Sequence, residues 1–177
     1  NSTASVANSS TFGTEANATA EDAIAVGHLS QASGQEAIAI GKSSVASEAN
    51  STAVGTEAEA SGENSTATGD NSEASGSDSA AYGFNAIASG ASSTSLGASS
   101  TATRAGAIAI GHLAQATEAR AIAIGSGSTA NANCSMALGW NANATAFNAT
   151  AIGFTANALG INSTAVGTSA ISTANYS

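Results

Sequence analysis

The two histidines of the chain are the residues best suited to form a metal site, provided that several copies of the chain come together. His28 and His112 each follow a glycine in near-identical segments, Gly-His-Leu-Ser-Gln and Gly-His-Leu-Ala-Gln. In a symmetric oligomer, equivalent imidazoles could form rings that bind a metal ion. Neither histidine has another histidine or a carboxylate at ligand spacing, so we favour the interpretation that both are variable turn residues in duplicated segments. We therefore predict no metal site.

The carboxylates, the hydroxyls and the single thiol are the other side-chain groups that could do chemistry. Pairs such as Glu57 with Glu59, or Asp70 with Glu73, could hold a cation, but a solvated acidic surface explains them more simply. Serine is abundant, yet no Gly-x-Ser-x-Gly elbow with convergent histidine and aspartate can be assembled. Cys134 is the single cysteine and can supply neither an internal disulfide nor a cysteine-based zinc site. The sequence thus predicts a protein that is not an enzyme and has no cofactor.

The composition limits both the core and the partners. The 177 residues include 3 Lys+Arg and 12 Asp+Glu, for a net charge of -9, and only 4% are aromatic. A core of large apolar side chains is hard to build from such a chain. The basic residues Lys42, Arg104 and Arg120 are too few to neutralise a row of phosphates, so we expect no binding to nucleic acid or to anionic lipid.

The sequence contains no signal for export and no run of about 18 apolar residues that could span a membrane. We therefore expect residues 1–177 to be an excised or processed segment that lacks a signal peptide and a membrane anchor and makes no contact with a membrane.

The glycines reveal how the chain is organised. A glycine occurs at every fourteenth position without insertion or deletion, and a second set lies halfway between. The first set is Gly13, Gly27, Gly41, Gly55, Gly69, Gly83, Gly97, Gly111, Gly125, Gly139, Gly153 and Gly167. The second set is Gly34, Gly62, Gly76, Gly90 and Gly160, so that only Gly106 and Gly127 lie off the grid. We expect these glycines at positive φ or at tight corners, and the whole chain to be one segment of about twelve repeats.

Each repeat predicts two short strands and two turns. The positions one and three before each glycine of the first set are mostly β-branched or aliphatic, and the position between them is nearly always alanine. This alternation is typical of a strand. A small-x-small segment such as Ala58 to Ala60 predicts the second strand. Asn or Asp five places before the glycine, as at Asp22 and Asn50, suits an Asx-type turn. Seven residues per half-repeat leave no room for a crossover helix, so the repeat predicts one rung of an all-β parallel solenoid with rungs about 4.8 Å apart.

The side-chain sizes predict which way each column points. If Ala and Ser line a narrow interior, the aliphatic column before the glycine must point outward and form a long apolar stripe, which self-association would cover. The reverse orientation, with Ile and Val inside and Ala outside, stays open on the sequence alone. The residues expected at the oligomer interface are Val26, Ile40, Val54, Leu96, Ile110, Ile124, Leu138, Ile152 and Val166.

The repeat resembles a known family. Residues 22–27 (Asp-Ala-Ile-Ala-Val-Gly), 36–41 (Glu-Ala-Ile-Ala-Ile-Gly) and 148–153 (Asn-Ala-Thr-Ala-Ile-Gly) are similar to the head repeats of trimeric autotransporter adhesins of the YadA-like type. The resemblance covers essentially the whole chain. It implies a left-handed parallel β-roll, a homotrimer, and exposure on a bacterial surface, with a stalk and an outer-membrane anchor that we do not find in this segment. The family commonly has Val where this chain has Thr at positions such as 52, 94 and 150, which makes the stripe more polar.

Asparagines in Asn-x-Ser/Thr sequons are unusually frequent, at ten of the fifteen asparagines. The repeat itself explains part of this excess, because it places Asn two residues before a Thr-rich column. Turn chemistry alone remains the alternative to glycosylation. The asparagines that we consider for glycosylation are Asn8, Asn17, Asn50, Asn64, Asn133, Asn143, Asn148 and Asn162.

Three functions are compatible with these features. A surface adhesin head, which attaches by multivalent binding to matrix, cells or surfaces, follows from the resemblance. A structural, N-glycosylated extracellular filament would use the same solenoid with sugars in place of a receptor site. An ice-binding rod ranks third, because Ile, Ala and Met interrupt the threonine column.

Overall fold

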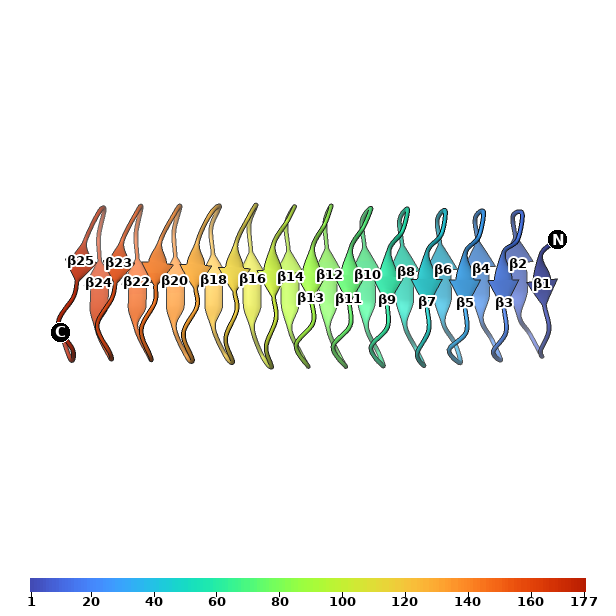
Figure 1. Cartoon of the computed structure of the whole chain (residues 1–177), viewed down its shortest axis with the longest axis horizontal. Coiled ribbons are helices and arrows are strands. Elements are labelled where there is room, and N and C mark those ends of the chain that lie inside the picture. Colours follow the sequence, from blue (N-terminus) through green and yellow to red (C-terminus); the bar gives the residue numbers. More distant parts are fainter. The chain divides into compact units, whose positions relative to one another are not determined.

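The computed structural model describes all 177 residues as short strands joined by turns, and it contains no helix (Figure 1). No segment is therefore a helix long and apolar enough to cross a membrane. The chain divides into two compact units, residues 1–89 and residues 90–177. Both units repeat the same fourteen-residue coil, and together they give the parallel β-solenoid of about twelve turns that the glycine spacing predicts.

Each coil contributes one strand to each of two sheets. The sheet that we call the three-residue sheet comprises the even-numbered strands. In the first unit these are β2 (Ser10–Phe12), β4 (Ile24–Val26), β6 (Ile38–Ile40), β8 (Thr52–Val54), β10 (Thr66–Thr68) and β12 (Ala80–Tyr82). In the second unit they are β14 (Thr94–Leu96), β16 (Ile108–Ile110), β18 (Ile122–Ile124), β20 (Met136–Leu138), β22 (Thr150–Ile152) and β24 (Thr164–Val166).

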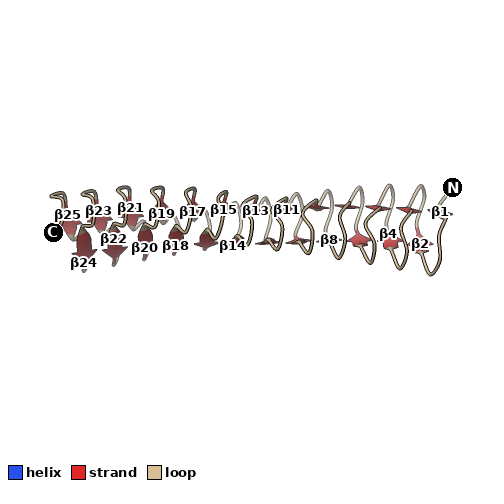
Figure 2. Ribbon diagram, turned by 90° about the horizontal axis from the view of Figure 1, so that it is seen from below, coloured by secondary structure: helices blue, strands red, loops and turns tan.

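The odd-numbered strands form the second sheet, which we call the two-residue sheet. In the first unit these are β1 (Thr3–Ala4), β3 (Asn17–Ala18), β5 (Gln31–Ala32), β7 (Val45–Ala46), β9 (Glu59–Ala60), β11 (Glu73–Ala74) and β13 (Ile87–Ala88). In the second unit they are β15 (Thr101–Ala102), β17 (Gln115–Ala116), β19 (Thr129–Ala130), β21 (Asn143–Ala144), β23 (Asn157–Ala158) and β25 (Ile171–Ser172). Figure 2 shows the strands of the two sheets on opposite sides of each coil.

The strands pair in parallel with a register of one repeat. Within the second unit, Ile108 pairs with Ile122 and Gln115 with Thr129, so every residue lies beside its counterpart in the next rung. The backbone hydrogen bonds consequently run from rung to rung, as in the 2.9 Å bond from the Ile108 N–H to the Ala121 carbonyl. This ladder satisfies the backbone of each narrow coil without any helix.

The interior is lined almost entirely by alanine and serine, with Thr11 at the inward position of the first three-residue strand. The buried alanines are 0 to 3% exposed, and the largest fully buried side chains are serines. Many of these serines close a turn by donating to the carbonyl three residues earlier, as Ser30 does to Gly27 at 2.9 Å and Ser128 does to Gly125 at 2.8 Å. The prediction that Ala and Ser face inward and the aliphatic column outward is confirmed, and the reverse orientation is wrong, because the two walls lie too close for Ile or Val.

The turns follow a spacing of seven residues that the glycines only partly reveal. Every seventh residue has a left-handed φ, including Asn8 at 57° and Asp22 at 59°, and Gly106 and Gly127 occupy this position at 66° and 68°. The glycines of the first set precede it by two residues and also have positive φ, as predicted. The halfway glycines Gly34 and Gly160 do not have positive φ, but they lie at tight corners, the other alternative of the prediction. A Cβ at either glycine would overlap a backbone carbonyl of the next rung.

Two neighbouring glycines of the second unit provide a matched test of these packing constraints. A Cβ at Gly111 would lie 2.7 Å from the Gly125 carbonyl, at a φ of 127°, whereas a Cβ at Gly106 would meet nothing nearer than the Arg120 Cγ at 3.8 Å. We predict that Gly111→Ala lowers the free energy of unfolding by about 3 kcal/mol. Gly106→Asn should cost less than about 1 kcal/mol, because Asn tolerates the left-handed region. Thermal unfolding followed by circular dichroism measures both, and equal losses would contradict the rung-to-rung clash.

Candidate functional site

No pocket indents the surface, and no three His, Cys, Asp or Glu side chains lie close enough to hold a metal ion. The coil is so narrow that every side chain larger than serine must point outward. Any function therefore has to use the outer surfaces of the two sheets or the turns at their edges.

The outer surface of the three-residue sheet, which we call the apolar face, carries one column of mostly aliphatic side chains and a second column in which Ile and Thr predominate. In the first unit, Ile24, Val26 and Ile40 point outward from β4 and β6. In the second unit, Leu96 is 46% exposed and Ile110 is half-buried by its column neighbours alone. All nine residues expected at the oligomer interface lie on this face, and each of them is exposed or half-buried.

The outer surface of the two-residue sheet, which we call the polar face, differs sharply. Its outward positions are dominated by Ser, Thr, Asn, Gln and Glu, such as Gln31 on β5, Thr101 on β15 and Asn143 on β21. Amide ladders link its rungs, since the Asn143 Nδ2 donates to the Asn157 Oδ1 at 3.3 Å. Each unit therefore has one face suited to contact with water and one face suited to burial.

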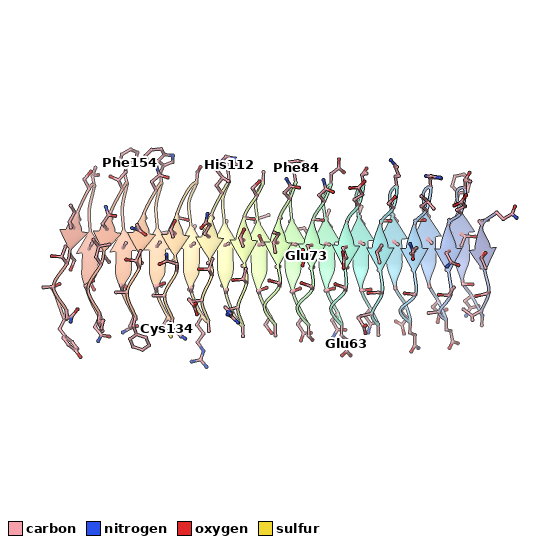
Figure 3. The ribbon with its side chains drawn as sticks, in the orientation of Figure 1. Glu63, Glu73, Phe84, His112, Cys134 and Phe154 are labelled. Carbon is pink, nitrogen blue, oxygen red and sulfur yellow. The ribbon has the colours of Figure 1, made fainter.

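The turns form two further surfaces. The glycine edge comprises the turns that follow the three-residue strands and begin at the first set of glycines. The second edge comprises the turns that follow the two-residue strands. Figure 3 shows His112 and Phe154 at the glycine edge of the second unit and Cys134 at its second edge.

The structure does not bring the two histidines together. His28 and His112 are both exposed, each directly after a glycine of the glycine edge, but they belong to different units. No other histidine or cysteine shares their turns. Their positions agree with the interpretation as turn residues in duplicated segments.

The two carboxylate pairs are also not assembled into a site. Glu57 lies in a turn of the glycine edge, whereas Glu59 points outward from β9. The Asp70 Oδ1 accepts a 3.1 Å hydrogen bond from the Thr56 N–H of the preceding rung, and the Glu73 Oε1 accepts one of 2.9 Å from the Ser75 hydroxyl. The carboxylates of Asp70 and Glu73 therefore take part in local hydrogen bonds at the surface.

The sequon asparagines fall into two groups. Asn8, Asn50, Asn64, Asn133 and Asn148 are exposed on the second edge, and Asn162 is half-buried there. Asn17 and Asn143 are half-buried on the polar face. In place of the expected Asx turns, the Asn64 Nδ2 donates along the edge to the Asp78 Oδ1 at 3.2 Å, and the Asn148 Nδ2 donates to the Asn162 Oδ1 at 2.9 Å. The amides of these two asparagines are therefore already hydrogen-bonded, like that of Asn143 in its ladder.

One feature of the edges was missed from the sequence. Trp140 and Phe154 occupy the same position in successive turns of the glycine edge, and their rings stack with centroids 4.7 Å apart and planes 13° from parallel. On the second edge, Phe147 and Ile161 are also exposed in successive turns. The fourteen-residue spacing within each pair was the signal that could have revealed them.

Comparison with known proteins agrees with this architecture. The family model described as the YadA head domain repeat (2 copies) matches residues 7–30, 32–58, 60–86, 88–114, 116–142, 144–170 and 158–177. A solved structure described as the collagen-binding domain of the Yersinia adhesin YadA is 27% identical, with 86% of this chain and 69% of that chain covered and a TM-score of 0.44. No curated protein sequence matches the chain.

The assignment rests on the repeat matches, which extend over nearly the whole chain and fall in register with the rungs. The family is one of adhesins and not of enzymes. The chain belongs to the YadA head domain repeat family.

Proposed function

We propose that residues 1–177 form the head segment of a surface-exposed adhesin, which assembles as a homotrimer and attaches to matrix, cells or surfaces through many repeated contacts. The observation that supports this most directly is the contrast between the two faces of each unit. One face carries Ile, Val and Leu, with Thr among them, and the chain leaves these side chains exposed or half-buried; the other face is polar.

The apolar face supports self-association. Soluble monomers rarely expose long continuous apolar patches, and a patch of this kind usually marks an interface. A second copy is a suitable occupant because its own apolar face has the same rung spacing and the same need for burial. Trimeric assembly is the arrangement that the family resemblance implies, and three apolar faces around one axis would leave the three polar faces in contact with water.

Attachment is distributed over the rungs in this proposal. A discrete site requires unlike residues that converge from distant segments, whereas each rung presents the same few residue types at the same positions. The variable residues lie at the turns, and a trimer would offer three copies of each. Weak contacts repeated in this way add through multivalency. We place the head outside the cell, held at the outer membrane by other parts of the same protein.

A glycosylated structural filament is the second candidate. It is favoured by one observation, the exposure of Asn8, Asn50 and Asn64 on the second edge of the first unit and of Asn133 and Asn148 on the second edge of the second unit. Sugars on these edges would coat each unit without entering either sheet. The two candidates share the fold and differ in what the edge carries.

The apolar face can be tested by three charged substitutions in the second unit. Ile110→Asp, Ile124→Asp and Ile152→Asp together should convert the trimer to a monomer or an insoluble chain, because each would bury an unpaired charge. Thr117→Asp, Thr129→Asp and Thr145→Asp place the same charges on the polar face of the same unit and should leave the trimer intact. Sedimentation velocity measures the assembly, and a folded trimer of the first variant would show that the apolar face is not the interface.

Distributed binding can be tested by removing one complete rung. Deletion of residues 50–63 preserves the register, so the first unit should lose one coil and keep its fold. Adhesion of coated beads to an immobilised matrix preparation should fall only modestly. The combined change His28→Ala and His112→Ala is the comparison, and we expect it to have little effect. If the histidine variant stays folded and trimeric but loses all adhesion, a discrete site exists and the distributed account fails.

The filament alternative is tested by mass. If the exposed sequons carry sugars, proteolytic peptides that contain them, prepared from the native source, should exceed the masses given by their sequences by whole saccharide units. Deglycosylation should remove the excess. Sequon peptides that all have the masses of the unmodified sequence would eliminate the glycosylated filament.

A further inference from the structure

We propose that the glycine edge of one copy packs against the second edge of the next copy, and that the stacked rings of Trp140 and Phe154 of the first copy pack against Phe147 of the second. This inference rests on the proposed trimer and adds a second interface to it, between edges and not between apolar faces. The partner is a second copy of this chain. The contact is confined to the rungs between residues 133 and 161.

The aromatic pair on the glycine edge is the first element of this contact. Trp140 and Phe154 are stacked, yet their side chains remain 48% and 52% exposed. The separation of 4.7 Å between their centroids matches the spacing of rungs, about 4.8 Å, so the solenoid itself holds the rings in their stack. A rigid aromatic surface of this kind loses little entropy when it is covered.

The opposite edge supplies a matching apolar surface. Phe147 is 53% exposed and Ile161 is 43% exposed, and both lie in turns of the second edge. Each rung gives one turn to each edge, so Phe147 leaves the coil half a rung after Trp140 and half a rung before Phe154. Ile161 likewise leaves the coil half a rung after Phe154. The apolar residues of the two edges therefore occupy the same levels of the second unit.

Cyclic symmetry explains why the levels should match. Copies related by an axis parallel to the solenoid have no offset along it, so a turn on one edge meets the turn at the same level on the neighbouring copy. Such a contact is heterologous, and it closes into a ring when each copy uses one edge on either side. A foreign ligand would give no reason for both edges to become apolar at the same rungs.

The edge contact is continuous with the apolar face. Leu138 and Ile152 are the last residues of β20 and β22 and stand two positions before Trp140 and Phe154. Burial of the apolar faces around the axis would therefore bring the glycine edge up to its neighbour. The aromatic pair would extend the buried surface from the face onto the edge.

The edges of the first unit match less well, which confines the proposal to the second unit. Lys42 on the glycine edge would meet Glu36 of the neighbouring copy at about the same level, and their opposite charges would attract each other. Asp70 on the same edge would lie at the level of Glu63 and Asp78, so that like charges would face each other. Direct packing is consequently proposed only where both edges are apolar.

The single tryptophan provides a direct test. Phe147 lies on the edge of its own chain opposite to Trp140, so its removal can change the surroundings of Trp140 only through a neighbouring copy. In the full 177-residue chain, Phe147→Ser should shift the emission of Trp140 to longer wavelength and increase its quenching by acrylamide, while sedimentation still shows a trimer. Phe84→Ser, which alters an exposed aromatic residue of the first unit, is the matched control and should leave the emission unchanged.

The outcomes separate this inference from the proposed trimer. Unchanged Trp140 emission in a folded, trimeric Phe147→Ser variant would overturn the edge contact and leave the trimer in place. A parent chain that sediments as a monomer would overturn the trimer and the edge contact together.

A cross-linking experiment gives an independent readout. With Cys134 replaced by Ser, the pair Trp140→Cys and Phe147→Cys should yield linked dimers and trimers with a short bismaleimide. Trp140→Cys with Thr145→Cys moves one thiol to the polar face and should yield none. Equal cross-linking of the two pairs would contradict the edge contact.

Discussion

The closeness of the two sheets is the constraint on which the rest of the structure depends. The space between them admits only Ala, Ser and Gly, as shown by interior alanines that are almost fully buried and by serines that are the largest fully buried side chains. Burial of such small groups gives little hydrophobic stabilisation per residue. Stability must therefore come from the rung-to-rung hydrogen bonds and from the burial of larger side chains outside the coil.

The same constraint determines where function can reside. Because nothing larger than serine fits inside, every aliphatic, aromatic and charged residue is presented to the outside, in columns that repeat at each rung. Columns of Ile and Val make one face a surface for burial, and columns of Ser, Thr and Asn make the other a surface for water. The proposed adhesin would act through repetition and length, and it would need neither a pocket nor a catalytic centre.

Much of the fold could be predicted from the sequence because a repeat without insertions turns spacing into geometry. The column from Gly13 to Gly167 defined the rung, and the alternation at Ile108, Ala109 and Ile110 defined the strand, but the sequence left open which of its sides faces inward. The role of Gly34 could not be predicted, because its close approach to the next rung is a property of the coil and not of its local dihedral angles. The Trp140 and Phe154 stack was missed because each residue is isolated in the sequence, and only the rung spacing places the two rings together.

The central claim is that the apolar face is buried between copies of the chain. The most direct measurement is the molar mass of the unmodified 177-residue chain in solution, by light scattering over a range of concentrations. The account predicts three times the 16.7 kDa of one chain, with no dissociation on dilution into the micromolar range. A folded, soluble species of 16.7 kDa at all concentrations would contradict it, because the columns of Ile, Val and Leu would then be stable in contact with water.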